Sequence, residues 1–265
     1  MAIIFNSRPG LVVYLTCGDP DLETTREVAL AAIGAGADVI ELGVPFSDPV
    51  ADGPVIQRAT ERALLRRTSL HDVLEVGRQV RQKAPEAGLV LFSYYNPVLR
   101  YGLEKLCKDA ARAGLDGALI TDLPVEEAEL YRRWMQASKL AAVFLAAPTS
   151  TDERLKAIAA ASSGFVYAVS RTGVTGARAE LPEDARDLVR RIRRYTRLPI
   201  AVGFGVSTAA QFAAVGEFAD AAVVGSAIVQ AIEHAGREGA AEAVAALVRE
   251  LRGATAAPHP GAKVK

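Results

Sequence analysis

The chain of 265 residues has little cysteine, few aromatic residues and no excess of either charge. Cys17 and Cys107 are too few and too far apart for a disulfide framework or a Cys-x-x-Cys metal site, so we expect reduced thiols in an intracellular protein. The 31 basic residues balance 31 acidic ones, and no Lys/Arg run with interleaved aromatics marks a nucleic-acid groove. The sequence therefore predicts no metal and no nucleic-acid partner.

Long hydrophobic runs and a secretion signal are also missing. No window approaches the roughly 20 apolar residues of a membrane span, and no basic segment precedes the short apolar run at 11–17. We therefore expect a cytoplasmic protein with no membrane partner. Residues 254–265 show no apolar periodicity and contain two prolines, so we expect a disordered tail outside the fold.

Aliphatic residues are what the chain has in abundance. Half of the residues are hydrophobic although only 6% are aromatic, which is typical of buried parallel strands covered by helices. Short apolar runs alternate with segments of 3.6-residue periodicity, so each predicted strand is followed by a helix. The strands are predicted at 11–16, 39–42, 89–94, 117–120, 141–146, 165–169, 200–203 and 221–224, and the helices at 23–35, 69–83, 103–113, 126–138, 152–161, 182–196 and 207–216.

This alternation predicts an α/β fold, a single (β/α)8 barrel with eight parallel strands and extra helices over residues 1–253, because about 250 residues is the usual size of that fold. Residues 34–38 and 113–117 repeat one design, in which a helix ends on glycine and an Asp turn leads to the next strand. A doubly wound open sheet is the alternative. It would normally carry Gly-x-Gly-x-x-Gly after the first strand, which Thr-Cys-Gly-Asp-Pro at 16–20 does not match.

Two acids flank a Gly/Pro-rich loop after the second predicted strand. In a barrel the active site lies at the carboxyl ends of the strands, and Glu41 and Asp52 lie on either side of such a loop. Enzymes commonly build proton-transfer sites in this way. The alternative is a glutamate neutralised by an arginine and an aspartate that caps the next helix, which is the commoner arrangement for a generic acid pair.

Lysine and histidine are absent from the predicted strand ends. All seven lysines and all three histidines fall on predicted helices or in the tail. The mouth of the barrel therefore offers no Schiff-base lysine, no imidazole base and no His-ligated metal. Proton transfer is expected to depend on carboxylates.

Glycine-rich loops follow the last two predicted strands. Phe204 and Gly205 come after the seventh strand, and Gly225 and Ser226 open the helix after the eighth. Backbone N–H groups at these two positions form the phosphate site that recurs in this fold, although the glycines could simply allow tight turns. A polar loop at 170–178 carries hinge glycines, and its composition suits either a lid that excludes water or an ordinary surface loop.

The pattern Glu-Leu-Gly-x-Pro-Phe-Ser-Asp-Pro-x-Ala-Asp-Gly at 41–53 resembles the signature of the tryptophan synthase alpha chain family. The likeness runs from about residue 11 to residue 253, with supporting segments at 15–20, 94–97, 122–127, 170–176, 203–205 and 225–227. It implies retro-aldol cleavage of indole-3-glycerol phosphate to indole and glyceraldehyde 3-phosphate, in the last step of L-tryptophan biosynthesis. It also implies no cofactor in this chain, and an alpha2-beta2 tetramer whose pyridoxal-phosphate beta chain receives the indole.

Carried over by position, the resemblance makes Glu41 the general acid/base and Asp52 the residue that holds the indole N–H. Apolar neighbours in its strand should raise the pKa of Glu41 and favour proton donation. Thr175 would hydrogen-bond Asp52 when the lid closes, and the loop with Pro45 and Asp48 would touch the beta chain. The other expected substrate contacts are Tyr14, Phe92, Leu119, Leu145 and Phe204 around the indole ring, although such residues line any barrel core, and Gly176, Phe204, Gly205, Gly225 and Ser226 around the phosphate. Tyr167 matches the tyrosine of the family that contacts the glutamate, although its ring could also belong to the core.

Family members usually begin with an additional helix, whereas only residues 1–10 precede the first strand here, so the floor of the barrel could be closed differently. Two other functions stay open. A different phosphate-binding barrel, such as a sugar-phosphate isomerase or indole-glycerol-phosphate synthase, would need a strand-end lysine or another acid pair. A binding subunit that mainly activates the beta chain cannot be separated by sequence from a self-sufficient lyase.

Overall fold

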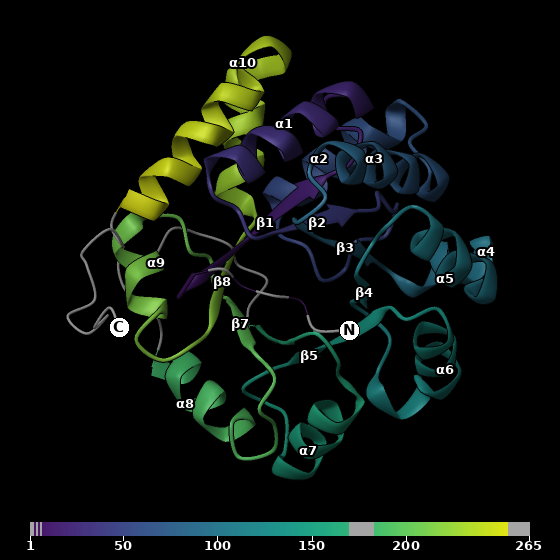
Figure 1. The fold of residues 1–265 in the computed structure, drawn as a ribbon, viewed down its shortest axis with the longest axis vertical. Helices are drawn as coiled ribbons and strands as arrows, with labels where there is room; N and C mark the ends of the chain where they lie inside the picture. The colour runs from purple at the N-terminus through teal and green to yellow at the C-terminus, as the bar shows by residue number, and fades with distance from the viewer. Residues whose placement is uncertain (1–2, 4, 6, 170–182, 254–265) are drawn as a thin grey trace, which may run out of the picture.

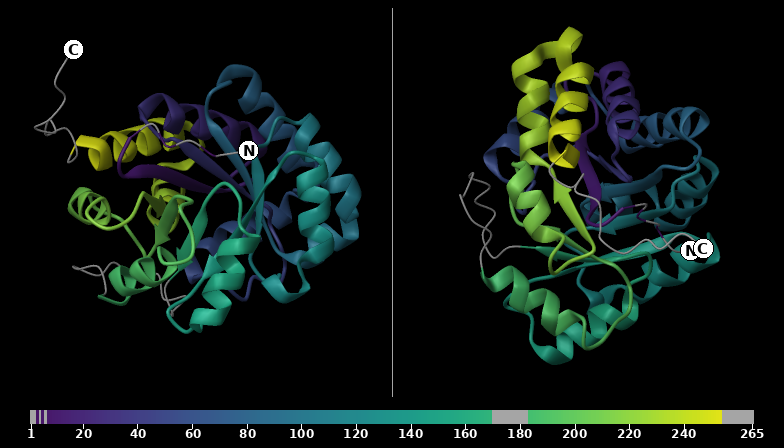
Figure 2. Two further views of the ribbon diagram at one scale, coloured as in Figure 1. Left: turned by 60° about the horizontal axis from the view of Figure 1, so that its bottom comes forward. Right: turned by 60° about the vertical axis from the view of Figure 1, so that its left-hand side comes forward.

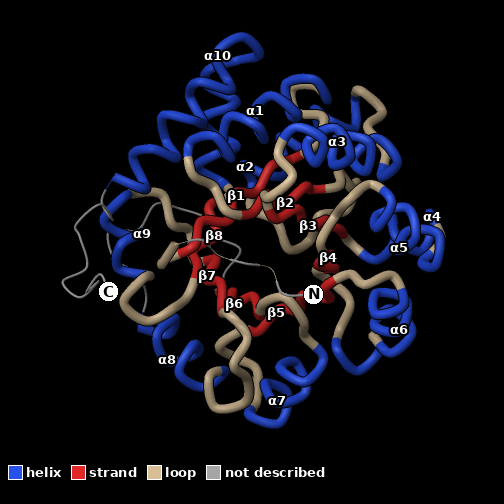
Figure 3. Tube along the Cα trace, in the orientation of Figure 1, coloured by secondary structure: helices blue, strands red, loops and turns tan. Residues whose placement is uncertain are grey.

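A computed structural model describes residues 3, 5, 7–169 and 183–253 of the chain. The described part forms a closed barrel of eight parallel strands in sequence order, with β8 paired to β1, which confirms the predicted (β/α)8 fold (Figure 1). The strands form an inner ring and the helices lie around it (Figure 3).

The strands agree with the predicted ones to within one residue at each end. The third strand ends at Ser93 instead of Tyr94, because Tyr94 already precedes the next helix as its N-cap, and the sixth begins at Val166. The bounds are β1 (Gly10–Thr16), β2 (Val39–Gly43), β3 (Gly88–Ser93), β4 (Gly117–Ile120), β5 (Ala141–Ala146), β6 (Val166–Val169), β7 (Ile200–Gly203) and β8 (Ala221–Val224).

All seven predicted helices are present; the helix at 152–161 has the predicted bounds and the others have altered ends. The segment predicted at 126–138 is split into η1 (Val125–Glu127) and α6 (Glu129–Ala137), since Ala128 between them has the non-helical angles φ −88° and ψ 9°. The last helix predicted before β7 ends at Ile192, four residues early. The others are α1 (Leu22–Ala35), α3 (Leu70–Lys83), α5 (Leu103–Arg112), α7 (Asp152–Ala161), α8 (Glu183–Ile192) and α9 (Ala209–Val215).

Two further helices and the extent of the last one were not predicted. α2 (Pro54–Leu65) begins directly after the candidate acid loop with proline at its first turn, and α4 (Tyr95–Tyr101) is a short helix after β3. α10 (Ser226–Gly253) consists of two limbs, because Gly236 breaks it with φ 66° and ψ −177°. The two limbs lie beside α1 (Figure 2).

The predicted glycine–aspartate turns close the amino ends of the strands. Gly36 ends α1 with φ 115°, and Asp38 accepts a hydrogen bond of 2.8 Å from the backbone N–H of Leu11 on the neighbouring strand. Asp116 does the same for Leu89 at 2.8 Å. Each turn therefore fixes the register of two strands at the end of the barrel opposite the candidate site.

The core has two layers. One fills the space between strands and helices, and the other fills the barrel itself with alternate strand residues such as Val39 and Leu119. At the floor this inner layer is closed by Ile3 and Phe5, with the Phe5 ring centroid 6.0 Å from that of Phe165. These two side chains close the floor from the segment ahead of β1.

Two smaller predictions can be compared with the structure. Lys139 lies in the turn before β5 with φ 59° and not on a helix, because α6 already ends at Ala137, so that placement was wrong. It precedes the amino end of β5 and not the carboxyl ends at which the candidate site lies. Within the described residues, none of the helices is both long and apolar enough to cross a membrane.

Candidate active site at the mouth of the barrel

Glu41 is buried inside the barrel. It is the third residue of β2, where it pairs with Tyr14 on β1 and Val90 on β3, and it shares the inward face of the strand with Val39. The side chain is 0% exposed, and neither carboxylate oxygen has a hydrogen-bond partner among the described residues. Burial raises the pKa of Glu41 from 4.5 to about 8. The described part of the chain therefore holds no arginine that neutralises this acid.

Asp52 lies at the end of the loop between β2 and α2. Its Oδ2 accepts a hydrogen bond of 3.0 Å from the hydroxyl of Tyr94, while its backbone carbonyl accepts one of 2.8 Å from Gln57 Nε2. Burial raises the pKa of Asp52 to about 6, against the opposing effect of the Tyr94 hydrogen bond. The N-cap of α2 is Gly53, without a side-chain cap, so the Asp52 carboxylate does not cap this helix.

Tyr94 is a site residue to which the sequence analysis assigned no role, although it lies in the segment 94–97 that supports the resemblance. Its hydroxyl also accepts a hydrogen bond of 3.0 Å from the backbone N–H of Ala51, and its ring lies 5.3 Å from that of Phe46. The available signal was its position directly after β3, at the carboxyl end of the strands. Its contact with Asp52 spans 42 residues of sequence and could not be read from spacing.

Tyr14 and Phe92, two of the predicted ring contacts, lie on the two strands that flank β2. Tyr14 packs edge-to-face on Phe92 with ring centroids 5.0 Å apart, and both border the small cluster beneath α2. Tyr167 on β6 is buried, and the charge of Glu41 is, after burial itself, the largest cause that raises its pKa. Leu119 and Leu145 belong to the same inner layer as Tyr167.

Tyr167 needs a glycine beside it. A Cβ at Gly203 would lie 2.7 Å from Tyr167 Cε1 and 2.8 Å from its hydroxyl oxygen. Atoms cannot approach so closely, so the ring occupies its place only because residue 203 has no side chain. This glycine of β7 therefore determines where the Tyr167 ring lies.

The predicted phosphate end combines two glycine-rich loops. Gly205 is exposed with φ 73°, and a Cβ there would meet nothing within 4 Å. A Cβ at Gly225 would come within 3.6 Å of the Cβ of Tyr14, so this loop lies next to one of the predicted contacts of the indole ring. Ser226 begins α10, and its hydroxyl is buried without a hydrogen-bond partner in the described residues. The ring of Phe204 packs against the layer between strands and helices.

Other predicted residues have different surroundings. Thr175, Gly176 and the whole loop 170–178 lie outside the described residues. Pro45 is buried, whereas Asp48 is exposed and accepts a hydrogen bond of 2.5 Å from the Ser47 hydroxyl. A surface hollow of about 320 Å³ lies between residues 46–50 and one face of α2, and Val50 at its edge is 85% exposed.

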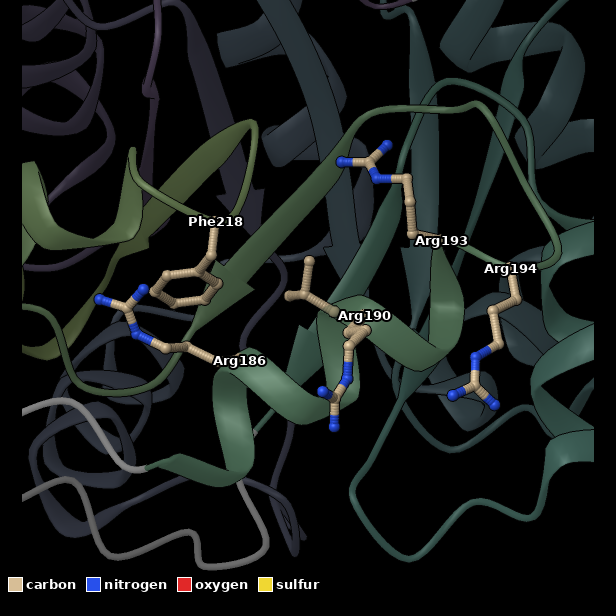
Figure 4. Close-up of a pocket in the computed structure, with 6 residues that line it drawn as sticks. Arg186, Arg190, Arg193, Arg194 and Phe218 are labelled. Carbon is tan, nitrogen blue, oxygen red and sulfur yellow. The ribbon is translucent and has the colours of Figure 1, made fainter.

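A second hollow, of about 310 Å³, lies on the outside of the barrel along α8 (Figure 4). Its arginines point in different directions and do not converge on one point (Figure 4). Each is also paired with an acid, so the hollow is an exposed ion-pair surface and not an anion site. The pairs are Arg186–Glu217, Arg190–Asp187, Arg193–Asp220 and Arg194–Asp152.

A closed (β/α)8 barrel with a buried glutamate, a second acid at the same mouth and a glycine-rich end at β7 and β8 defines the class of barrel enzymes that use carboxylates. No group of three His, Cys, Asp or Glu side chains in the described ranges could hold a metal ion. The model of the tryptophan synthase alpha chain family matches residues 3–256, and the chain belongs to this family.

Individual relatives agree with the family match. The tryptophan synthase alpha chain of Solibacter usitatus is 51% identical over 247 residues, which cover 93% of this chain and 92% of the relative. That of Ralstonia nicotianae is 45% identical and covers 92% of each.

Solved structures agree as well. The chain resembles one from Mycobacterium tuberculosis tryptophan synthase with a TM-score of 0.87 and 40% identity, covering 93% and 92% of the two chains. A chain of the Pyrococcus furiosus tryptophan synthase complex gives a TM-score of 0.86 at 40% identity, covering 94% of this chain and 100% of that one.

Proposed function

We propose that this chain cleaves indole-3-glycerol phosphate to indole and glyceraldehyde 3-phosphate, with Glu41 as general acid/base and Asp52 as the acceptor of the indole N–H. Family membership supports the reaction. One observation carries the residue assignment: within the described residues, the buried side-chain polar atoms without a hydrogen-bond partner are the two Glu41 oxygens and the Ser226 hydroxyl. Such atoms are costly in a folded protein, and a ligand that pairs with them would remove that cost.

Glu41 performs both proton transfers in this proposal. In its protonated form it donates a proton to C3 of the indole, and the resulting carboxylate then accepts the proton of the hydroxyl on the adjacent glycerol carbon. The carbon–carbon bond breaks as that hydroxyl becomes the aldehyde, and Glu41 ends protonated again, so the protons balance. A pKa of about 8 supports this role, because the acid is largely protonated at neutral pH.

Asp52 stabilises the positive charge that develops on the ring when C3 is protonated. With a pKa of about 6 it is mostly ionised at pH 7, so it accepts a hydrogen bond from the ring N–H. The two acids therefore work in opposite protonation states. Tyr14, Phe92, Leu119, Leu145 and Tyr167 supply the apolar surface on which the ring packs.

The phosphate is assigned to the loops after β7 and β8. The N-terminus of α10 favours an anion, and Ser226 adds a buried hydroxyl that can donate a hydrogen bond. Phe204, Gly205, Gly225 and, in the segment outside the described residues, Gly176 would contribute backbone N–H groups. Thr175 is assigned to hydrogen-bond Asp52.

The partner in this proposal is a beta chain, in an alpha2-beta2 tetramer. The exposed loop with Asp48 and Val50 supports a contact at this mouth, and Pro45 shapes the same loop from its buried side. Pyridoxal phosphate belongs to the beta chain. The alpha reaction needs no cofactor, because Glu41 and Asp52 account for every proton and charge in it. A cytoplasmic location stays a prediction.

The first test is release of indole from indole-3-glycerol phosphate by the purified chain, with and without a pyridoxal-phosphate beta chain. We expect indole in both conditions, with faster release in the presence of the partner. Indole in neither condition would contradict the lyase, whereas indole only with the partner would favour a subunit that depends on complex formation.

The residue assignment is tested with Glu41→Gln, which keeps the size of the side chain but cannot exchange a carboxyl proton. We expect no measurable turnover and nearly unchanged substrate binding. Glu75→Gln is the matched control, since Glu75 lies on α3 in an exposed pair with Arg78. Turnover by Glu41→Gln at the control's rate would remove Glu41 from the mechanism. Asp52→Asn should also have strongly reduced turnover, and turnover at the control's rate would contradict the role of Asp52.

A further inference from the structure

One arginine joins three elements that converge on the site. Arg62 of α2 donates two hydrogen bonds to the Asp19 carboxylate, at 2.7 and 2.8 Å, and a third to Glu233 Oε1 at 2.8 Å. Asp19 follows β1 and is 4% exposed, and Glu233 lies in the first limb of α10. Arg58, one turn earlier on α2, reaches the same glutamate at 3.2 Å.

Each of these elements carries a different part of the proposed site. α2 follows Asp52 directly, so it holds the end of the site that receives the indole N–H. The first limb of α10 begins with Ser226, at the proposed phosphate end, and the break at Gly236 separates it from the second limb. β1 carries Tyr14 between them. Arg62 therefore connects the helix that follows Asp52 with the helix that begins at Ser226.

Besides Arg62, the contact between α2 and α10 consists of the Arg58–Glu233 pair and a small apolar cluster. Val55 and Ala59 of α2 pack on Val229 of α10 together with Tyr14. These few apolar contacts are not directional, so the charged side chains beside them decide how the two helices are held relative to each other. The bidentate pair between Arg62 and the buried Asp19 is directional and holds α2 at the end of β1, while the bond from the same guanidinium to Glu233 joins α10 to this anchor.

We propose that Arg62 is a positioning residue that sets the distance between the Asp52 end and the Ser226 end of the site. This role rests on the proposed function, because it matters only for a ligand that places a ring and a phosphate in the two ends at once. Such a ligand gains affinity from simultaneous binding only when its length matches the spacing of the two ends. Indole alone or phosphate alone is indifferent to that spacing.

The test compares three probes on wild type and Arg62→Met: indole, inorganic phosphate, and a non-cleavable analogue in which three methylene carbons join indole to a phosphate. We expect Arg62→Met to bind the two fragments within about twofold of wild type and the linked analogue about tenfold more weakly. KM for the substrate should rise by a similar factor, while the pH dependence of kcat, set by Glu41, should not move. Arg62→Lys keeps the charge without the bidentate geometry. Its affinity for the linked analogue should lie between those of wild type and Arg62→Met.

Arg78→Met is the control, since it breaks an exposed arginine–glutamate pair on α3. Glu233→Gln serves as a second variant that keeps the Asp19 pair intact; it should weaken the analogue less than Arg62→Met and leave the fragments unchanged. Unchanged affinity for the analogue in Arg62→Met, or an equal loss for all three probes, would overturn the positioning role. A wild-type chain that neither binds the analogue nor releases indole would instead overturn the proposed function.

Discussion

The hydroxyl of Tyr94 donates a hydrogen bond to Asp52 and accepts one from the backbone of Ala51, each at 3.0 Å. Tyr94 comes from the end of β3, whereas the other two residues belong to the loop after β2. The ring of Tyr94 also packs on Phe46 of that loop. One side chain of the neighbouring strand thus determines where the second acid of the site lies.

Replacing Tyr94 with Phe keeps the ring and removes both hydrogen bonds. The lost donor stabilises the ionised form of Asp52, so the pKa of Asp52 should rise above about 6 and its ionised fraction at pH 7 should fall. We expect a loss of about tenfold in kcat/KM and a shift of the acid limb of the pH–rate profile to higher pH.

Tyr101→Phe is the control for that variant. Tyr101 donates a hydrogen bond of 2.8 Å to Asp109, which forms an equivalent tyrosine–aspartate pair on α4 and α5. Its removal should leave the profile unchanged. An acid limb in Tyr94→Phe that coincides with wild type would show that the hydrogen bond does not tune Asp52.

Turnover should depend on pH with a maximum between about 6 and 8. Below this range Asp52, with its pKa raised to about 6, becomes protonated and no longer stabilises charge on the ring. Above it Glu41, with its pKa raised to about 8, loses the proton that it must donate. The measurement is kcat/KM for indole release from pH 5 to 10. A rate that keeps rising to pH 10 would contradict Glu41 as the acid.

Glu41 should also make the fold less stable as the pH rises. Burial raises its folded-state pKa to about 8 from 4.5. The contribution of Glu41 to the free energy of unfolding is therefore fully present below pH 4.5 and is lost as the pH rises through 8. Glu41→Gln removes this effect. We expect similar free energies of unfolding at pH 5, and a variant more stable than wild type by about 3–4 kcal/mol at pH 9.

Urea denaturation at pH 5, 7 and 9 tests this, because the other titrating groups are common to both proteins and cancel in the difference. For Glu75→Gln the difference in the free energy of unfolding from wild type should not increase between pH 5 and 9. A constant difference between wild type and Glu41→Gln across the three pH values would mean that the carboxyl group is not buried in the folded chain.

The barrel could be predicted because each part of it leaves a local signal. β2 and β4 are short runs of buried apolar residues, and the turns with Asp38 and Asp116 bind the adjacent strand through one carboxylate each. Glu41 could be predicted as well, since a lone acid in an apolar strand contradicts the pattern around it. These features depend on neighbours in sequence.

The rest depends on contacts between distant segments. Arg62 is separated from Asp19 by 43 residues and from Glu233 by 171, and on α2 it looks like any exposed helical arginine. Tyr94 looks like the last residue of a strand until the loop folds over it. The closure of the floor by Ile3 and Phe5 likewise carries no periodicity, because only two side chains take part.

Arg252 offers a test of whether the floor and the mouth of the barrel are independent. At the end of α10 it donates hydrogen bonds to the carbonyls of Gly36, at 2.7 and 2.8 Å, and of Pro9, at 2.9 Å, and it pairs with the buried Asp38. Arg252→Met leaves that acid without this partner, so the free energy of unfolding should fall by about 3 kcal/mol.

The same variant should keep kcat and KM at wild-type values at temperatures where it is folded, because Asp52 lies beyond the other end of β2 and Glu41 is held inside the barrel by the pairing of β2 with β1 and β3. Arg249→Met, which breaks an exposed pair with Glu242 on the same helix, should cost less than about 1 kcal/mol. Urea titration and steady-state assays on the two variants separate stability from turnover. A fall in kcat for fully folded Arg252→Met would mean that the floor controls the geometry of the site.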